Sequence, residues 1–356
     1  MRSPAEGPRW SCSIGELEIR DMAGLKNIAI AGATGAVGAD MISTLERRDF
    51  PVGNLRLLAS SRSVGKKLKF KGEELPVEEL KSDSFKDIDI ALFSAGAARS
   101  KEFARHAVAA GAVVVDNSSA FRMDDEVPLV VPEVNPDAVR DHNGIIANPN
   151  CSTIIMLVAV NPLHKAAKVK RIVAATYQAA SGAGAAAMRE LEEQTRELLD
   201  GGDPASQAFV HRLAFNLFPH IDVFQENGYT KEEMKMVLES RKIMGHPELM
   251  VSCTCVRVPV PRAHSEALNI EFEREITPDE ARRIISEAPG VELRDDPSAN
   301  VYPMPADASG EDDVFVGRIR QDISRDDKRG LDIFVSGDQL LKGAALNAVQ
   351  IAELLV

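Results

Sequence analysis

The chain has 356 residues, which suggests about two domains, and 44% of them are hydrophobic, which is enough to fill real cores. Its formal net charge of −12 at pH 7 argues against a nucleic-acid-binding surface, because duplex binding needs clustered positive charge. No apolar stretch approaches the roughly 20 residues of a membrane span.

The N-terminal segment and the cysteines bear on the compartment. Residues 1–22 lack the apolar core of a secretory signal, so we predict a disordered extension or an upstream start codon. The four cysteines, Cys12, Cys151, Cys253 and Cys255, form no disulfide framework, and no second close pair exists for zinc. We therefore expect no metal site and a reducing, cytoplasmic setting.

A glycine-rich turn follows the first predicted strand. The strand spans 27–31, the turn spans 32–38, and the next helix places Val37, Met41 and Leu45 on one face. Glycines at these spacings let the backbone approach a pyrophosphate at the helix N-terminus. The GxxGxxG pattern is weak on its own, and a purely structural turn is the alternative. The strand-turn-helix context favours nucleotide binding.

The second predicted strand, 55–59, ends in Ser60-Ser61-Arg62-Ser63. A free ribose 2′-hydroxyl usually meets an acidic residue at this point, whereas a 2′-phosphate needs arginine and hydroxyl donors. No acidic residue stands there, so the loop predicts NADP rather than NAD. The alternative is that Arg62 and Lys66 merely solvate a loop.

The rest of the first half predicts a doubly wound parallel sheet. Further strands are expected at 89–93, 112–115 and 145–147, alternating with helical segments. Polar loops at 116–122 and 131–135 follow strands, and ligands of such sheets bind at the carboxyl ends of the strands. We therefore expect these loops to face a ligand.

Cys151 lies between a turn at 148–150 and the apolar run 154–160, which we interpret as a buried helix. Its thiol is therefore expected at a helix N-terminus, where free N–H groups and the helix dipole favour the thiolate that a nucleophile needs. The alternative is a small buried hydrophobic residue. The polar flanks and the turn favour catalysis.

The second half predicts an α+β domain with a mostly antiparallel sheet. Its final helix is expected to pack on the first domain, which gives a nucleotide-binding domain of 23–150 completed by 339–356 and a second domain of 151–338. Strands 251–260 and 266–272 alternate like half-buried antiparallel strands. The other expected elements are a strand at 171–179, a flexible turn at 181–184, an amphipathic helix ending at 201–202, a helix opened by a capping box at 277–280, and strands at 314–320 and 332–335.

A thiolate that attacks a carbonyl needs a proton shuttle, an orienting donor and, for a charged substrate, a counter-ion. His264 can exchange a proton near neutral pH, Gln178 can donate to an oxyanion, and Arg257 can bind a carboxylate. By residue type alone, a surface histidine and a structural arginine are the more frequent cases.

Together these stretches resemble aspartate-semialdehyde dehydrogenase over almost the whole chain after Met22. The matching strings, in chain order, are GATGAVG, ASSRSVGKKL, SAGA, DNSSAFRM, VPEVN, ANPNCST, YQAASGAG, PHID, EEMKMVLESRKI, TCVRVPV, HSEA and GDQLLKGAALNAVQIAE. Two segments depart from the family pattern: the N-terminal extension and the long polar stretch 303–313.

The resemblance implies a Rossmann-type NADP-binding domain and a catalytic and dimerisation domain, in a homodimer. It implies Cys151 as nucleophile, His264 as acid/base and Gln178 as the residue that orients the acyl group. The implied substrate contacts are Arg257 for the α-carboxylate, Glu232 (or its neighbour Glu233) for the α-amino group, and Arg122 and Lys235 for phosphate. The implied cofactor contacts are Thr34, Gly35, Ala36, Val37, Arg62, Ser63, Ser181, Gly182 and Gln339.

The implied reaction is the reversible NADPH-dependent reduction of L-aspartyl 4-phosphate to L-aspartate 4-semialdehyde, in the biosynthesis of lysine, diaminopimelate, threonine, methionine and isoleucine. Two alternatives stay open. One is N-acetyl-γ-glutamyl-phosphate reductase, which shares the fold and the cysteine chemistry. The other is a non-catalytic nucleotide-binding paralogue.

Overall fold

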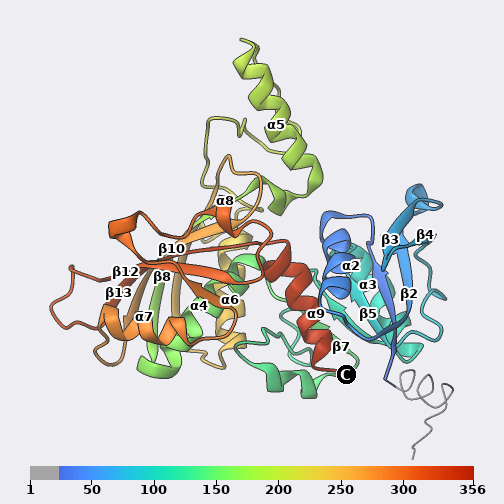
Figure 1. Ribbon diagram of the computed structural model, residues 1–356, viewed down its shortest axis with the longest axis horizontal. Helices are drawn as coiled ribbons and strands as arrows, with labels where there is room; N and C mark the ends of the chain where they lie inside the picture. Colours follow the sequence, from blue (N-terminus) through green and yellow to red (C-terminus); the bar gives the residue numbers. More distant parts are fainter. Residues whose placement is uncertain (1–23) are drawn as a thin grey trace, which may run out of the picture.

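The protein, described by a computed structural model over residues 24–356, has two lobes that are each built around one sheet (Figure 1). The predicted extension at residues 1–22, and with it Cys12, lies outside the described residues. The predicted fold class is confirmed, because a largely parallel sheet is joined to an α+β half whose sheet is mostly antiparallel.

The first lobe contains a seven-stranded sheet of order β3-β4-β2-β1-β5-β6-β7. All of its pairings are parallel except β3 with β4, a hairpin that the sequence reading missed. Charged residues fill most outward positions of this hairpin, so its sequence contains only a short pattern of apolar residues. The strands are β1 (Lys26–Ala31), β2 (Val52–Ala59), β3 (Lys67–Phe70), β4 (Glu73–Glu79), β5 (Ile90–Phe93), β6 (Val113–Asp116) and β7 (Ile145–Ala147).

Helices cover both faces of this sheet. Met41 and Leu45 of α2 (Ala36–Arg47) share one apolar core with Val349 of α9 (Leu346–Glu353), while α3 (Ala97–Ala109) packs into the core on the other face. The chain's last helix therefore packs on the first lobe, where Figure 1 shows it between the two halves.

The C-terminal segment is not one regular helix. A π-helical turn, η5 (Leu341–Ala345), precedes α9. Its i→i−5 hydrogen bonds include Gly343 N–H to the Asp338 carbonyl at 3.0 Å, and the Asp338 side chain accepts from the Leu340 N–H at 2.9 Å. A continuous helix over 339–355 was therefore the wrong expectation at its start.

The second lobe contains a six-stranded sheet of order β11-β12-β13-β10-β8-β9. The pairings β12·β13, β13·β10 and β10·β8 are antiparallel, whereas β11·β12 and β8·β9 are parallel. The expected antiparallel placement of β9 is therefore wrong, because the long connection from β8 returns the chain to the start of that strand. The strands are β8 (Val169–Gln178), β9 (Met250–Arg257), β10 (His264–Phe272), β11 (Val291–Leu293), β12 (Val314–Gln321) and β13 (Gly330–Gly337).

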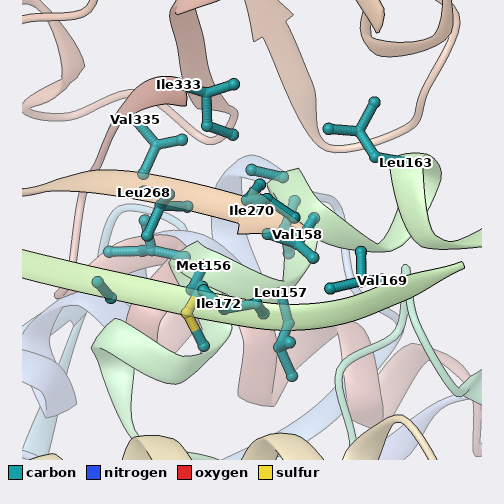
Figure 2. Packing of buried hydrophobic residues seen from close by; sticks show 14 of the residues in the cluster. Met156, Leu157, Val158, Leu163, Val169, Ile172, Leu268, Ile270, Ile333 and Val335 are labelled. Carbon is teal, nitrogen blue, oxygen red and sulfur yellow. The ribbon is translucent and has the colours of Figure 1, made fainter. Parts of the chain in front are cut away.

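The inner face of this sheet is covered by α4 (Cys151–Ala167), α6 (Lys231–Ile243) and α7 (Pro278–Ser286). Figure 2 shows side chains of α4 packed against β8, β10 and β13; those labelled include Met156, Leu157, Val158, Ile172, Leu268, Ile270, Ile333 and Val335. This core fixes α4, and therefore the position of Cys151 at its first turn.

Two of the described helices lie at the margin of the second lobe, namely α5 (Ala185–Leu199) and the short α8 (Pro305–Ala308). Helix α5 projects from the body of the molecule in Figure 1, and Leu191 packs in a small separate cluster with Phe218. The expected flexible turn before it is a single 3₁₀ turn, η3 (Ala180–Ala183). Within residues 24–356, every helix is too short or too polar to cross a bilayer.

Candidate functional site

A cleft of about 630 Å³ lies between the lobes, and most of the predicted site residues line it. The first lobe contributes the glycine-rich turn and the loop that carries Arg122, while α4 contributes Cys151. The second lobe contributes the ends of β8 and β9, the η3 turn and α6. The predicted site residues in its wall are Gly35, Ala36, Val37, Arg122, Cys151, Gln178, Ser181, Gly182, Glu232, Lys235, Arg257 and Gln339.

A second cavity of about 420 Å³ continues from the first, sharing Gly35 and Ser94 with it. Thr34 and Arg62 line this cavity, and the buried Ser63 lies behind it with its hydroxyl 3.3 Å from that of Thr34. Two residues that the sequence reading missed, Glu79 and Arg99, also line it.

The glycine-rich turn leaves room for an anion. A Cβ at Gly38 would lie 2.3 Å from the Gly32 carbonyl oxygen, so this close approach of helix and turn requires glycine. The N-cap of α2, Gly35, has no side chain to bond the first N–H groups of the helix. Gly35 lines both cavities, so this helix N-terminus lies where they meet, and helix N-termini are ready-made sites for a pyrophosphate.

Asn150 positions Cys151. As the N-cap of α4, its Oδ1 accepts from the N–H groups of Ser152 and Thr153 at 3.1 and 3.2 Å. Its Nδ2 donates to Glu232 Oε1 at 2.9 Å, which connects the nucleophile's turn to α6. The predicted place of Cys151, at the start of a buried helix, is confirmed.

The pKa of Cys151 differs from the expected one. Burial and the Glu232 carboxylate raise the pKa of the thiol to about 12, against the opposing effects of Arg122 and the Ser152 N–H. The helix N-terminus therefore favours the thiolate as predicted, but burial is the larger effect. In this structure burial therefore opposes the thiolate that the helix N-terminus favours.

Glu232 is a buried carboxylate at the centre of a polar network. Its Oε1 accepts from Asn150 and from Gln178 Nε2 (3.2 Å), and its Oε2 accepts from Lys235 Nζ at 2.9 Å. Burial alone would raise its pKa, but the charge and hydrogen bond of Lys235, together with the hydrogen bonds from Asn150 and Gln178, outweigh burial and lower it. Lys235 Nζ also donates to Asp222 Oδ2 at 2.8 Å, so it lies between two carboxylates.

Glu233, the other candidate for the substrate amine, has a structural position instead. Its carboxylate accepts from the Thr230 N–H at 2.7 Å, completing a capping box, and from the Cys255 N–H at 3.0 Å. Glu233 does not line the cleft, whereas Glu232 does.

Arg122 is held by a residue that the sequence reading missed. Its Nη1 donates to Glu239 Oε1 at 3.1 Å, and both side chains are buried. Glu239 Oε2 accepts from the Asn150 N–H at 2.6 Å, so one carboxylate positions both Arg122 and the turn before Cys151. The sequence signal was available, because Glu232, Lys235 and Glu239 share one face of a helix at spacings of three and four.

His264 lies directly behind the cleft wall. A Cβ at Gly182 would be 3.1 Å from His264 Nε2 and from Arg257 Nη1, so a side chain there would have to displace these groups by a few tenths of an ångström. Arg257 itself donates to the Ala179 carbonyl at 2.5 Å and is buried.

The tautomer of His264 follows from its contacts. Burial and the Arg257 charge lower its pKa well below the ordinary value, so the ring is neutral at pH 7. Its Nδ1 accepts from the Ala179 N–H at 3.1 Å, so the proton is on Nε2. Nε2 has no hydrogen-bond partner within the described part of the chain and is therefore free to donate.

Comparison with known proteins agrees with this geometry. Residues 27–142 match the family model "Semialdehyde dehydrogenase, NAD binding domain", and residues 160–342 match "Semialdehyde dehydrogenase, dimerisation domain". The aspartate-semialdehyde dehydrogenase of Synechocystis sp. is 56% identical over 329 residues, which cover 92% of this chain and 97% of that protein.

Solved structures agree as well. Aspartate semialdehyde dehydrogenase II complexed with ASA, from Vibrio cholerae, has a TM-score of 0.90 and 48% identity, covering 93% of this chain and 98% of that one. Aspartate semialdehyde dehydrogenase with NADP from Candida albicans has a TM-score of 0.72 and 25% identity, covering 93% and 98%. Since the relatives match nearly from end to end and the two family models cover both lobes, this chain belongs to the aspartate-semialdehyde dehydrogenase family.

Proposed function

We propose that this enzyme catalyses the reversible, NADPH-dependent conversion of L-aspartyl 4-phosphate to L-aspartate 4-semialdehyde and phosphate. The observation that carries this proposal is the position of Cys151, at a helix N-terminus in a cleft that joins a dinucleotide-type cavity to buried groups of both charges. An amino acid with an activated side-chain carboxyl presents the complementary groups.

The substrate would be held by four side chains. Arg257 would bind the α-carboxylate and Glu232 the α-amino group. Arg122 has five N–H donors and uses three of them, on Glu239 and on two backbone carbonyls, so two remain for phosphate. Lys235 has three N–H donors and uses two of them on carboxylates, so one remains for phosphate.

Cys151 Sγ would attack the acyl carbon, the bond from that carbon to the phosphate oxygen would break, and the thiol proton would leave with the phosphate, which forms a thioester. NADPH, when bound, supplies the two-electron reduction of this thioester. His264 Nε2–H would donate a hydrogen bond to the resulting oxyanion and pass it a proton that His264 regains from solvent. Collapse of the thiohemiacetal would then free the aldehyde, and the hydroxyl proton would return to sulfur to restore the thiol. Covalent capture divides one difficult step into easier ones.

The second cavity supports NADP as the cofactor. Arg62 and the hydroxyls of Ser60 and Ser61 lie at the end of β2, where a 2′-phosphate would bind. We propose that Thr34 to Val37 contact the pyrophosphate, with Ser181, Gly182 and Gln339 at the nicotinamide end. Gln339 is fixed there because its Oε1 accepts from the Ala263 N–H at 2.8 Å and its Nε2 donates to Ser181 Oγ.

We also propose a homodimer formed through the outer face of the second sheet. The helices α4, α6 and α7 cover only the inner face, and Tyr177 and Met250 are partly exposed on the other. The match of residues 160–342 to a dimerisation domain supports this assignment. The free thiol that the chemistry needs favours a reducing, cytoplasmic setting.

The alternative substrate, an N-acetyl-γ-glutamyl phosphate, is less well matched. Its amine is acylated and uncharged, so it would offer the buried Glu232 carboxylate no cationic group in addition to Lys235. Rate assays with both acyl phosphates separate the two, and a clear preference for the acetylated compound would overturn our assignment.

The direct test is mass spectrometry of the enzyme mixed with L-aspartyl 4-phosphate without cofactor. We expect an acyl adduct on Cys151, and Cys151→Ala should lose both the adduct and turnover while NADPH binding is retained. Full turnover by Cys151→Ala, or an adduct on another residue, would contradict the proposal and leave a nucleotide-binding role as the alternative.

A further inference from the structure

Thr176 lies two residues before Gln178 on the same face of β8, and the structure joins the two side chains. Thr176 Oγ1 donates to Gln178 Oε1 at 3.0 Å. Thr176 is fully buried, and Gln178 is nearly so where it reaches the cleft. Residues two apart in a strand point to one side, so this contact is built into the strand.

The two ends of the Gln178 amide have different partners. Nε2 donates to Glu232 Oε1 at 3.2 Å, and an ionised carboxylate can only accept. A flipped amide would place its carbonyl against that carboxylate. Thr176 completes the arrangement, because its hydroxyl gives the Gln178 carbonyl a donor. One of the two N–H groups on Nε2 remains available to the cleft.

Thr176 has one hydrogen to donate, and two other groups flank it. Glu266 on β10 and Cys255 on β9 lie directly opposite it in the sheet. Neither carboxyl oxygen of Glu266 has a hydrogen-bond partner within the described residues. The Cys255 sulfur is a weak acceptor and donates its own hydrogen to Met236 Sδ, so the Gln178 carbonyl is the stronger acceptor for the Thr176 hydroxyl.

We propose that Thr176 is a positioning residue that holds Gln178 as a hydrogen-bond donor to the acyl oxygen on Cys151. A donor aimed at an oxygen where negative charge develops accelerates acyl chemistry by about 10²- to 10³-fold. The inference deepens the proposed function and rests on it, because it requires an acyl group on Cys151.

The test uses the full-length enzyme and the oxidation of aspartate semialdehyde in the presence of NADP and phosphate. Thr176→Val keeps the shape and removes the hydroxyl, while Thr176→Ser and Thr176→Ala share a missing methyl and differ by the hydroxyl alone. We expect Val and Ala to lower kcat at least about tenfold with KM within about twofold, and Ser to stay within about threefold of wild type. The Ser and Ala pair decides the question if the Val variant does not fold.

A double-mutant cycle shows whether Thr176 acts through Gln178. In a Gln178→Ala background, Thr176→Val should change kcat by less than about twofold, since its target is gone. The matched control is Thr195→Val on α5, whose hydroxyl donates to the Leu191 carbonyl of its own helix and which should leave kcat unchanged.

Wild-type kcat in Thr176→Val, equal losses in the Ser and Ala variants, or an undiminished loss in the Gln178→Ala background would each overturn the inference. Failure of the proposed function gives a different result, because the wild-type enzyme itself would then neither turn over aspartate semialdehyde nor form an adduct on Cys151.

Discussion

Glu266 gives this protein a pH-dependent stability that can be measured. It is fully buried in β10, and neither carboxyl oxygen has a hydrogen-bond partner among residues 24–356. Burial raises its pKa well above the ordinary value. Below the ordinary glutamate pKa, the folded and unfolded states both carry the proton. As the pH rises above that value, only the unfolded state releases it, and folding loses about 1.4 kcal/mol per pH unit until the folded pKa is reached.

Glu266→Gln removes this dependence, because its amide does not titrate and the free energy cost of burying it is the same at each pH. Relative to wild type, the variant should therefore gain unfolding free energy as the pH rises from 5 to 7, by at most about 1.4 kcal/mol per pH unit. Glu266→Leu should be more stable than wild type at pH 7, because an apolar side chain of similar volume carries no desolvation cost.

The assay is urea unfolding followed by circular dichroism at pH 5, 6 and 7. Glu273→Gln is the matched control, because Glu273 follows the same strand but is exposed. The difference in unfolding free energy between this control and the wild type should be the same at all three pH values. If the Glu266→Gln curves also stay parallel to wild type, the buried carboxyl is not protonated and the reasoning is refuted.

Two further predictions concern the site. Gly343→Ala would place a methyl 2.8 Å from Cys151 Cβ, so displacement of the nucleophile should lower kcat about a hundredfold. Unchanged turnover in a variant with the wild-type melting temperature would show that the first turn of α4 accommodates the methyl and would contradict this prediction. Arg62→Ala should raise the KM for NADPH at least about tenfold and leave that for NADH unchanged, since only NADPH has the 2′-phosphate. Equal effects on the two cofactors in steady-state assays would count against the assigned loop.

The fold was predictable where burial and periodicity agree. Val37, Met41 and Leu45 mark one side of α2, and the turn before Cys151 marks the start of α4. Helix α6 lacks such a signal, because its inward face carries Glu232 and Glu239 as well as apolar side chains. A helix that supplies a polar site does not show the apolar stripe that identifies other helices.

The sequence predicted which residues line the site better than it predicted their pKa values. Cys151, Gln178 and Arg257 line one cleft as expected, and their roles remain predictions. The raised pKa of Cys151 depends on burial and on the distance to Glu232, which no local spacing reveals.

The position of the C-terminal segment has a consequence for synthesis on the ribosome. Val349 and Ile351 belong to the core of the first lobe, although they are translated some two hundred residues after Cys151. Because a nascent chain folds in the order of its emergence, we expect an incomplete first lobe, with part of one apolar sheet face uncovered, until this segment has emerged. A polypeptide ending after Asp338 should bind the dye ANS strongly, and ordinary NADPH affinity in that fragment would contradict this view. Newly made enzyme would then complete its nucleotide-binding lobe only after the second lobe has been translated.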